Sequence, residues 1–278
     1  MSLPPGATDV RRVGGGDINE AFRVTLADGR DAFVKTRRGA HPGEYRAEAE
    51  GLQWLREPGH VRTPAVLEVG EDYLALEWVE RGRLHSDGVD ELGQGLARTH
   101  AAAAPCFGDF RPSGGGETRF GSLQLPNDPT EDWPTFYAQR RLLPLARLAR
   151  DRNALSASGV ETVERVAARM PDLAGPHEPP ARLHGDLWSG NVMSDAEGRP
   201  WLIDPSAYGG HREVDLAMLR LFGAPSDRVF NVYEDETALA EGWVERVELY
   251  QLLPLLVHAL LFGGSYRASA ERAAERYV

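Results

Sequence analysis

The alternation of apolar and polar positions predicts strands and a single helix in the first eighty residues. Two apolar-rich runs, Ala21 to Leu26 and Asp31 to Lys35, flank Asp28-Gly29, a strong hairpin-turn signal. Glu44 to Arg56 contains no proline and spaces its apolar residues along one face of a helix. Tyr73 to Val79 is a short apolar run typical of a buried strand. This part of the chain therefore predicts a small sheet with one helix.

From residue 86 onward the pattern is mostly helical. Helices are predicted over Asp87 to Ala104, Asp132 to Arg150, Gly159 to Met170, Val214 to Phe222, Trp243 to Phe262 and Ala268 to Arg276. Short strands are expected around Val192 and Leu202. The segment from Pro105 to Pro129, rich in Gly, Pro and polar residues, is expected to be a long loop or lid. We therefore expect an α+β fold with an N-terminal lobe at residues 1–80 and a larger C-terminal lobe at 81–278.

Composition narrows the classes of function. The formal net charge of −11 disfavours non-specific nucleic-acid binding, because such binding depends on Lys and Arg to neutralise phosphates. The amino terminus has neither a basic stretch nor an apolar run, so no signal peptide is expected. Leu249 to Phe262 is apolar but too short and interrupted to span a membrane. The single cysteine, Cys106, allows no internal disulfide and fits a reduced, cytoplasmic setting.

Three residues in the second half of the chain indicate phosphoryl transfer. Asp186 and Asn191 lie five positions apart among glycines, and Asp204 ends the apolar run Trp201 to Ile203. A strand, a turn and a strand between Asn191 and Asp204 would place both side chains at one pocket. In kinase-type sites one Asp meets the acceptor hydroxyl, while an Asn and a second Asp hold magnesium ions against the nucleotide. Turn formation alone accounts poorly for all three residues at this spacing.

Lys35 ends a predicted strand, where a lysine in a kinase-type site contacts the nucleotide phosphates. Glu48, on the following helix, is the preferred ion-pair partner of Lys35. Glu50 is a rival partner and Glu44 a weaker one. The alternative interpretation is an exposed strand lysine and a solvated helix glutamate.

Two other segments indicate a nucleotide pocket more weakly. Gly14, Gly15 and Gly16 precede the predicted hairpin, and successive glycines let backbone amides approach phosphate oxygens. A glycine run is, however, also a common flexible turn. Glu77 and Val79 lie where the chain leaves the first lobe, so their backbone groups are available to an adenine edge. An ordinary strand end is the alternative there.

Several residues around the central loop have open roles. His184 is interpreted as stabilising the loop rather than as a general base. Trp188 either stacks against a sugar or amine substrate or packs under the loop. Asp215 is expected to brace the loop by accepting backbone hydrogen bonds, and His211 is a weaker candidate in the same run. Glu213 is expected to cap the helix and to form a surface charge pair.

These segments resemble the fructosamine kinase (ketosamine-3-kinase) family, which groups with aminoglycoside phosphotransferases and choline kinases and has a protein-kinase-like fold. The resemblance is carried by residues 183–191, 203–205 and 208–218, with 14–19, 33–35 and 47–52 matching the small-lobe pattern. It covers most of the chain. The His-Gly-Asp core is shared by the broader group, whereas the forms Asp-Leu-Trp-Ser-Gly-Asn and His-Arg-Glu-Val-Asp-Leu are narrower.

The resemblance implies an ATP-dependent, magnesium-requiring kinase. Lys35 would contact the phosphates, Glu48 would orient Lys35, and Asp186 would accept or orient the sugar hydroxyl. Asn191 and Asp204 would bind Mg²⁺. The family phosphorylates the 3-hydroxyl of ketosamines, sugar–amine adducts formed by glycation, and the product then decomposes to release the amine.

Two alternatives stay open at this point, an aminoglycoside or other amino-alcohol phosphotransferase and a nucleotide-binding pseudokinase. The second is disfavoured because Lys35, Asp186 and Asp204 are all retained. In one respect the chain departs from some family members, which carry a cysteine in the glycine-rich loop that supports redox-controlled dimerisation. This loop has no cysteine, so such switching is not expected.

Overall fold

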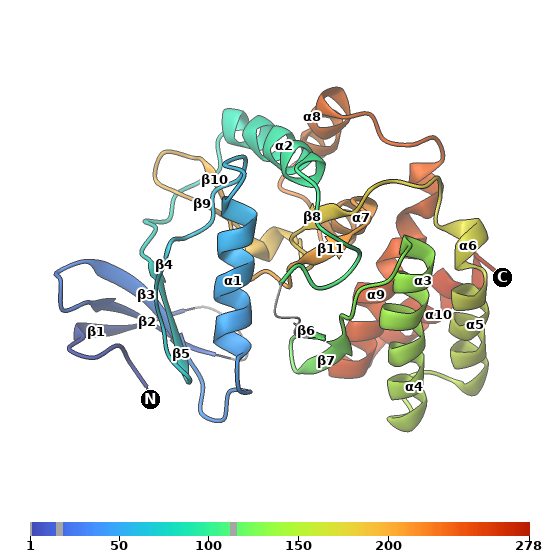
Figure 1. The fold of residues 1–278 in the computed structure, drawn as a ribbon, viewed down its shortest axis with the longest axis horizontal. Coiled ribbons are helices and arrows are strands. Elements are labelled where there is room, and N and C mark those ends of the chain that lie inside the picture. The colour runs from blue at the N-terminus through green and yellow to red at the C-terminus, as the bar shows by residue number, and fades with distance from the viewer. Residues whose placement is uncertain (1, 15–18, 112–115) are drawn as a thin grey trace.

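The computed structural model describes residues 2–14, 19–111 and 116–278. Its N-terminal part is an antiparallel sheet of five strands in the order β1-β2-β3-β5-β4, with helix α1 against one face (Figure 1). The elements are β1 (Thr8–Val13), β2 (Glu20–Thr25), β3 (Asp31–Thr36), α1 (Glu44–Arg56), β4 (Val66–Val69) and β5 (Tyr73–Glu77). The predicted hairpin, helix and buried strand are confirmed, and the sheet gains β1 and β4.

The two faces of this sheet carry separate apolar clusters. One contains Phe22, Val24, Ala32, Val34 and Ala75, and the other contains Leu74 and Leu76 with Tyr45, Ala49 and Leu52 of α1. Because side chains alternate along a strand, Lys35 lies on the same face as Phe33, which packs against the α1 cluster. The strand pattern therefore directs the lysine toward the helix.

Helices dominate the rest of the chain (Figure 1). They are α2 (Ser86–Ala101), α3 (Trp133–Tyr137), the π-helical η1 (Ala138–Leu142), α4 (Leu143–Asp151), α5 (Ala157–Ala168), α6 (Met170–Leu173), the short 3₁₀ turn η2 (Ser189–Asn191), α7 (Glu213–Leu221), α8 (Arg228–Glu236), α9 (Trp243–Phe262) and α10 (Ser265–Glu275). Antiparallel strand pairs join β8 (Ala181–Leu183) to β11 (Tyr208–Gly210) and β9 (Val192–Ser194) to β10 (Pro200–Leu202). The α+β prediction is confirmed, while the lobe boundary after residue 80 stays a prediction.

The expectation of a loop without regular elements at residues 105–129 is wrong. The segment contains a β-hairpin, β6 (Glu117–Phe120) with β7 (Leu123–Pro126). Each strand has only four residues, and the Gly- and Pro-rich flanks mask them in the sequence. Thr118, Phe120, Leu123 and Leu125 are buried, so one face of the hairpin packs into the protein.

Helix α9 runs through the largest apolar cluster even though it contains Pro254. Proline has no N–H and frees the carbonyl four residues earlier, that of Tyr250. The Tyr137 hydroxyl donates to the carbonyl oxygens of Tyr250 (3.2 Å) and Leu249 (3.3 Å), so the freed acceptor is satisfied. Among the described residues, no helix combines the length and apolarity that a membrane span requires.

Candidate active site

A cleft of about 1130 Å³ lies between the sheet and the helical part. It is large enough for a nucleotide and a second small molecule, since typical ligand sites occupy roughly 300–1,000 Å³. Lys35 and Glu48 line it from one side, and Asp186, Asn191 and Asp204 from the other. The structure thus brings the five main candidate residues to one cavity.

Lys35 lies at the centre of an ion-pair cluster. Its Nζ pairs with the Glu48 carboxylate and lies 2.8 Å from Asp204 Oδ1. Burial alone would lower the pKa of Lys35, but Asp204 and Glu48 together raise it, so the lysine is held as a cation. Burial raises the pKa of Glu48 to about 7 against the attraction of Lys35. The rival carboxylates pair elsewhere, Glu44 with Arg37 and Glu50 with Arg111.

Asp186 lies in the loop that follows β8. Asn191 Nδ2 donates to the Asp186 backbone oxygen (2.8 Å) and to Asp186 Oδ2 (3.2 Å), so the two side chains are fixed against each other. Burial raises the pKa of Asp186 to about 7; the Asn191 hydrogen bond opposes the shift, and the charges of Asp204 and Asp215 add to it. A carboxyl group with this pKa exchanges protons readily near neutral pH.

Asp204 is placed by the β9–β10 hairpin. The Ile203 N–H donates to the Asn191 carbonyl (3.1 Å), which brings the residue before Asp204 against Asn191. Asp204 itself has φ 53°, a left-handed conformation that is costly for a residue other than glycine. Such strain is typical of functional positions. Lys35 lowers the pKa of Asp204, which therefore stays ionised.

The residues at this point fit a magnesium ion. Asn191 uses Nδ2 as a donor, which leaves its Oδ1 available, and Asp204 uses Oδ1 for Lys35, which leaves Oδ2. Oxygen ligands of this kind suit Mg²⁺, which usually takes one or two carboxylates and completes its shell with phosphates and water. The described residues contain no cluster of three or more His, Cys, Asp or Glu suited to a metal.

Asp215 on α7 accepts hydrogen bonds from the loop that carries Asp186. Its Oδ2 accepts the His184 N–H (2.7 Å) and its Oδ1 accepts the Gly185 N–H (2.9 Å). His100 Nε2 lies 3.2 Å from Oδ2. Asp215 is fully buried, and these partners lower its pKa against the effect of burial. The geometry is that expected of a loop-positioning carboxylate.

His184 also faces the loop and is absent from the cleft lining. Its Nε2 donates to the Ile203 carbonyl (2.9 Å), and its Nδ1 accepts the Asp186 N–H (3.3 Å). The ring therefore links the segment of Asp204 to that of Asp186. Burial lowers its pKa, which keeps it neutral at pH 7.

Trp188 and the nucleotide-side residues line the cleft. Trp188 is 39% exposed and packs edge-on to Phe222, so one part of its ring remains open to a ligand. Glu77 and Val79 border the cavity where β5 ends, and Gly14 borders it where β1 ends. Gly15 and Gly16 lie outside the described residues, so their predicted role stays a prediction.

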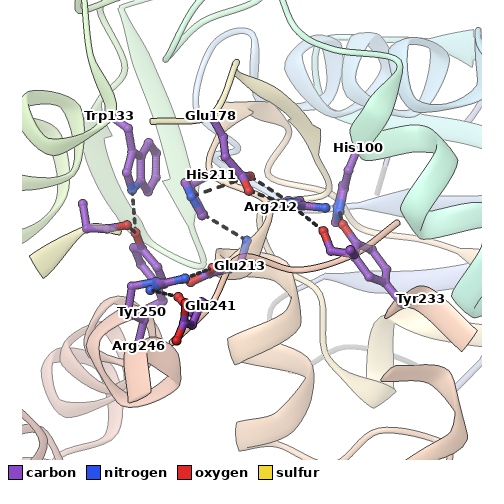
Figure 2. Close-up of polar contacts among 12 residues, drawn as sticks. His100, Trp133, Glu178, His211, Arg212, Glu213, Tyr233, Glu241, Arg246 and Tyr250 are labelled. Carbon is purple, nitrogen blue, oxygen red and sulfur yellow. Dashed lines mark hydrogen bonds and ion pairs between the residues drawn. The ribbon is translucent and has the colours of Figure 1, made fainter. Parts of the chain in front are cut away.

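A buried polar network surrounds the start of α7 (Figure 2). Arg212 pairs with Glu178 through two bonds of 2.7 and 2.8 Å, and His211 Nε2 lies 3.7 Å from the same carboxylate. Glu213 pairs with Arg246 through bonds of 2.6 and 2.9 Å. Glu213 is 2% exposed, so the expectation of a surface charge pair is wrong. His211 is buried and does not line the cleft.

Sequence reasoning missed the cleft residues of the β6–β7 hairpin. Glu117, Arg119 and Gln124 all line the cavity. Ser206 ties the hairpin to the catalytic segment, since its Oγ donates to the Arg119 carbonyl (2.6 Å). The alternation of polar and apolar residues at 117–120 was the available signal, but the run is too short to recognise in a Gly-rich context.

Comparison with known proteins gives consistent results. The fructosamine kinase family model matches residues 4–278. A probable ketoamine kinase of Thermus thermophilus is 41% identical over 93% of this chain and 90% of its own length. One from Enterococcus faecium is 36% identical over 95% of this chain and 93% of its own. A crystal structure named as a "putative fructosamine-3-kinase" from Thermobifida fusca has 43% identity and a TM-score of 0.88, over 97% of this chain and 94% of that one.

More distant structures share the protein-kinase-like fold. The choline kinase LicA from Streptococcus pneumoniae is 16% identical with a TM-score of 0.63, covering 97% of this chain and 92% of that one. LicA has also been solved in complex with AMP. The family match spans nearly the whole of this chain and agrees with the geometry of the cleft. The chain therefore belongs to the fructosamine kinase family, and it is an ATP-dependent phosphotransferase with an alcohol acceptor.

Proposed function

We propose that this chain phosphorylates the sugar 3-hydroxyl of ketosamines, either fructosamines or ribulosamines, in a cytoplasmic deglycation reaction that uses ATP and Mg²⁺. The observation that supports this most directly is the convergence of Lys35, Glu48, Asp186, Asn191 and Asp204 on one cleft. The narrow family match supports the ketoamine acceptor.

The nucleotide end of the site is assigned to Lys35 and its surroundings. Lys35, held as a cation by Glu48 and Asp204, is suited to the α- and β-phosphates. Backbone groups at Glu77 and Val79 are suited to the adenine, and the Gly14 to Gly16 segment to the phosphates. The part up to residue 80 would then be the nucleotide-binding lobe.

The acceptor end is assigned to Asp186. A carboxyl with a pKa near 7 is able to orient a hydroxyl and accept its proton as the oxygen attacks phosphorus. Mg²⁺, when bound, supplies charge neutralisation on the transferred phosphoryl group. Asn191 Oδ1 and Asp204 Oδ2 would hold the ion. Asn191 Nδ2 also donates to Asp186 Oδ2 and so fixes the orientation of the Asp186 carboxylate. Asp215 and His184 position the loop without touching the reactants.

The test is a panel of acceptors. ATP consumption by the purified protein would be compared on fructosyl-lysine, ribulosyl-lysine and an aminoglycoside, with Mg²⁺ and with EDTA. We expect Mg²⁺-dependent turnover of one or both ketoamines, with phosphorus NMR placing the phosphate on the 3-oxygen.

Turnover of the aminoglycoside alone would support the alternative amino-alcohol phosphotransferase. ATP binding without turnover on any acceptor would support the pseudokinase. Phosphorylation at another sugar oxygen would leave the kinase assignment intact but contradict the 3-hydroxyl.

A further inference from the structure

The β6–β7 hairpin presents a polar face to the cleft. Side chains alternate along each strand, so Thr118 and Phe120 share one, buried face while Glu117 and Arg119 share the other; Thr118 also borders the cavity. Gln124 is directly opposite Arg119 in the strand register and shares its face. These three polar side chains all line the cavity.

The buried Arg141 holds this hairpin firmly. The Arg141 guanidinium donates to the Pro126 carbonyl (2.7 Å) and to Asn127 Oδ1 (2.8 Å) at the end of β7. It also lies over the rings of Phe136 and Tyr208, at 4.5 and 4.3 Å from their centroids. The polar face is therefore presented by a fixed element, which is what specific recognition requires.

Arg119 differs from three other cations that line the cleft. Lys35, Arg37 and Arg111 are all paired with carboxylates. In residues 2–14, 19–111 and 116–278, the side-chain acceptor for Arg119 is the neutral Gln124 Oε1, 3.1 Å from Nη2. Since a guanidinium has five N–H donors, most of the Arg119 fork remains available to an anion in the cavity.

The hairpin lies on the acceptor side of the site. Ser206 joins it to the catalytic loop, because the Ser206 hydroxyl donates to the Arg119 carbonyl (2.6 Å) and the Ser206 N–H donates to the His184 carbonyl (3.0 Å). By contrast, Arg81 follows the strand end that carries Glu77, and its backbone forms an isolated β-bridge with that of Asp195 beside the β9–β10 hairpin. In Figure 1 the β6–β7 hairpin is level with the lower end of α1, whereas β9 and β10 lie near its upper end.

Glu117 and Arg119 together present opposite charges two positions apart on one strand face. Glu117 is exposed and forms no ion pair with another described residue. A ketoamine made from a free amino acid carries a matching pair of charges, a secondary ammonium and, next to it, a carboxylate. If the anion bound by Arg119 were instead a phosphate on the sugar, its two negative charges would lie close to the Glu117 carboxylate and be repelled by it.

We propose that Arg119 and Gln124 bind the α-carboxylate of the acceptor while Glu117 binds its ammonium, so that the preferred substrates are ketoamines of free amino acids linked through the α-nitrogen. This rests on the proposed ketoamine kinase function and specifies its substrate class. Arg119 and Glu117 are then specificity-determining residues, and the adduct of a protein-bound lysine, which lacks a free carboxylate beside its nitrogen, is a poorer substrate.

The test compares two acceptors of matched shape. Fructosyl-glycine carries the carboxylate, and fructosyl-isobutylamine replaces it by an isosteric branched alkyl group while keeping the ammonium. We expect wild-type kcat/KM to favour the glycine adduct about 10- to 100-fold, the range for a charge-assisted hydrogen bond. Arg119→Gln should reduce this ratio to about one, because it should lower kcat/KM for the glycine adduct far more than for the isobutylamine adduct. Glu117→Gln should lower kcat/KM for both adducts by the same factor, because both carry the ammonium.

Arg272→Gln is the matched control, because Arg272 is an exposed arginine of α10 that also donates to a neutral oxygen, that of Ser269. It should keep the wild-type ratio. A wild-type ratio near one, or an equal loss on both adducts in Arg119→Gln, overturns the carboxylate assignment while leaving the kinase function standing. A larger Arg119 dependence for fructosyl-isobutylamine 6-phosphate would show that the anion is a phosphate and would also overturn it. No turnover of any ketoamine would reject the proposed function and this inference together.

Discussion

Replacing Asp215 by Asn tests whether the catalytic loop is held from behind by a buried charge. Asp215 accepts two backbone N–H groups of the loop, at 2.7 and 2.9 Å, and lies 3.2 Å from His100 Nε2. The Asn side chain keeps one oxygen and turns an amide group toward a donor, so at least one loop N–H loses its acceptor. A bond to a charged group is worth about 1.5–3 kcal/mol.

We therefore expect Asp215→Asn to lower the free energy of unfolding by about 1.5–3 kcal/mol, measured by urea titration. Because the loop that carries Asp186 would be displaced, kcat should fall about 10- to 100-fold. The KM for ATP should change by less than about twofold, since Lys35 lies on β3 and does not contact Asp215. Asp172→Asn, at an exposed position, is the control and should behave as wild type. Unchanged kcat in folded Asp215→Asn would refute the bracing role.

The remaining predictions concern the Lys35 cluster and the network at α7. Lys35→Met should lower kcat about 10²- to 10³-fold with raised KM for ATP, because Glu48 then has no cation to orient; wild-type ATP kinetics would contradict this. Arg246→Met should cost about 3–5 kcal/mol of unfolding free energy by leaving Glu213 buried and unpaired, and Glu213→Met in the same chain should restore much of the loss; a further loss in the double variant would argue against it. Burial lowers the pKa of His211 to about 4, so below pH 6.5 the unfolded chain binds a proton that the folded chain does not. Unfolding free energy should therefore fall between pH 6.5 and 4, and in His211→Phe that fall should be smaller by up to about 3 kcal/mol; identical pH profiles would exclude the effect.

The elements with strong periodicity were predictable from the sequence. Helix α1 at Glu44–Arg56 and helix α9 at Trp243–Phe262 have the predicted bounds, the second despite Pro254. The sequence was sufficient to place both helices, because α1 has an apolar stripe at helical spacing and α9 is one long apolar run. The loop that carries Asp186 and Asn191 was also identifiable, because its glycines and polar residues follow a fixed spacing.

Features that depend on tertiary contacts were not predictable. The β6–β7 hairpin is held by Arg141, 15 positions from Pro126, and by Ser206, 87 positions from Arg119. Its four-residue strands are too short to be recognised from the sequence alone. Helix α8 (Arg228–Glu236) was missed for a similar reason, because it is short and packs against α2. The burial of Glu213 could not be inferred either, because its partner Arg246 lies 33 positions away on another helix.

The most direct test of the central claim is the turnover of Asp186→Asn. The substitution keeps the size of the side chain and removes the carboxylate that is proposed to receive the hydroxyl proton, next to Asn191 and facing the cleft. We predict that the variant keeps the wild-type circular dichroism spectrum and binds ATP, yet shows no measurable phosphorylation of a ketoamine that the wild type turns over. Full activity of this variant would contradict the proposed mechanism.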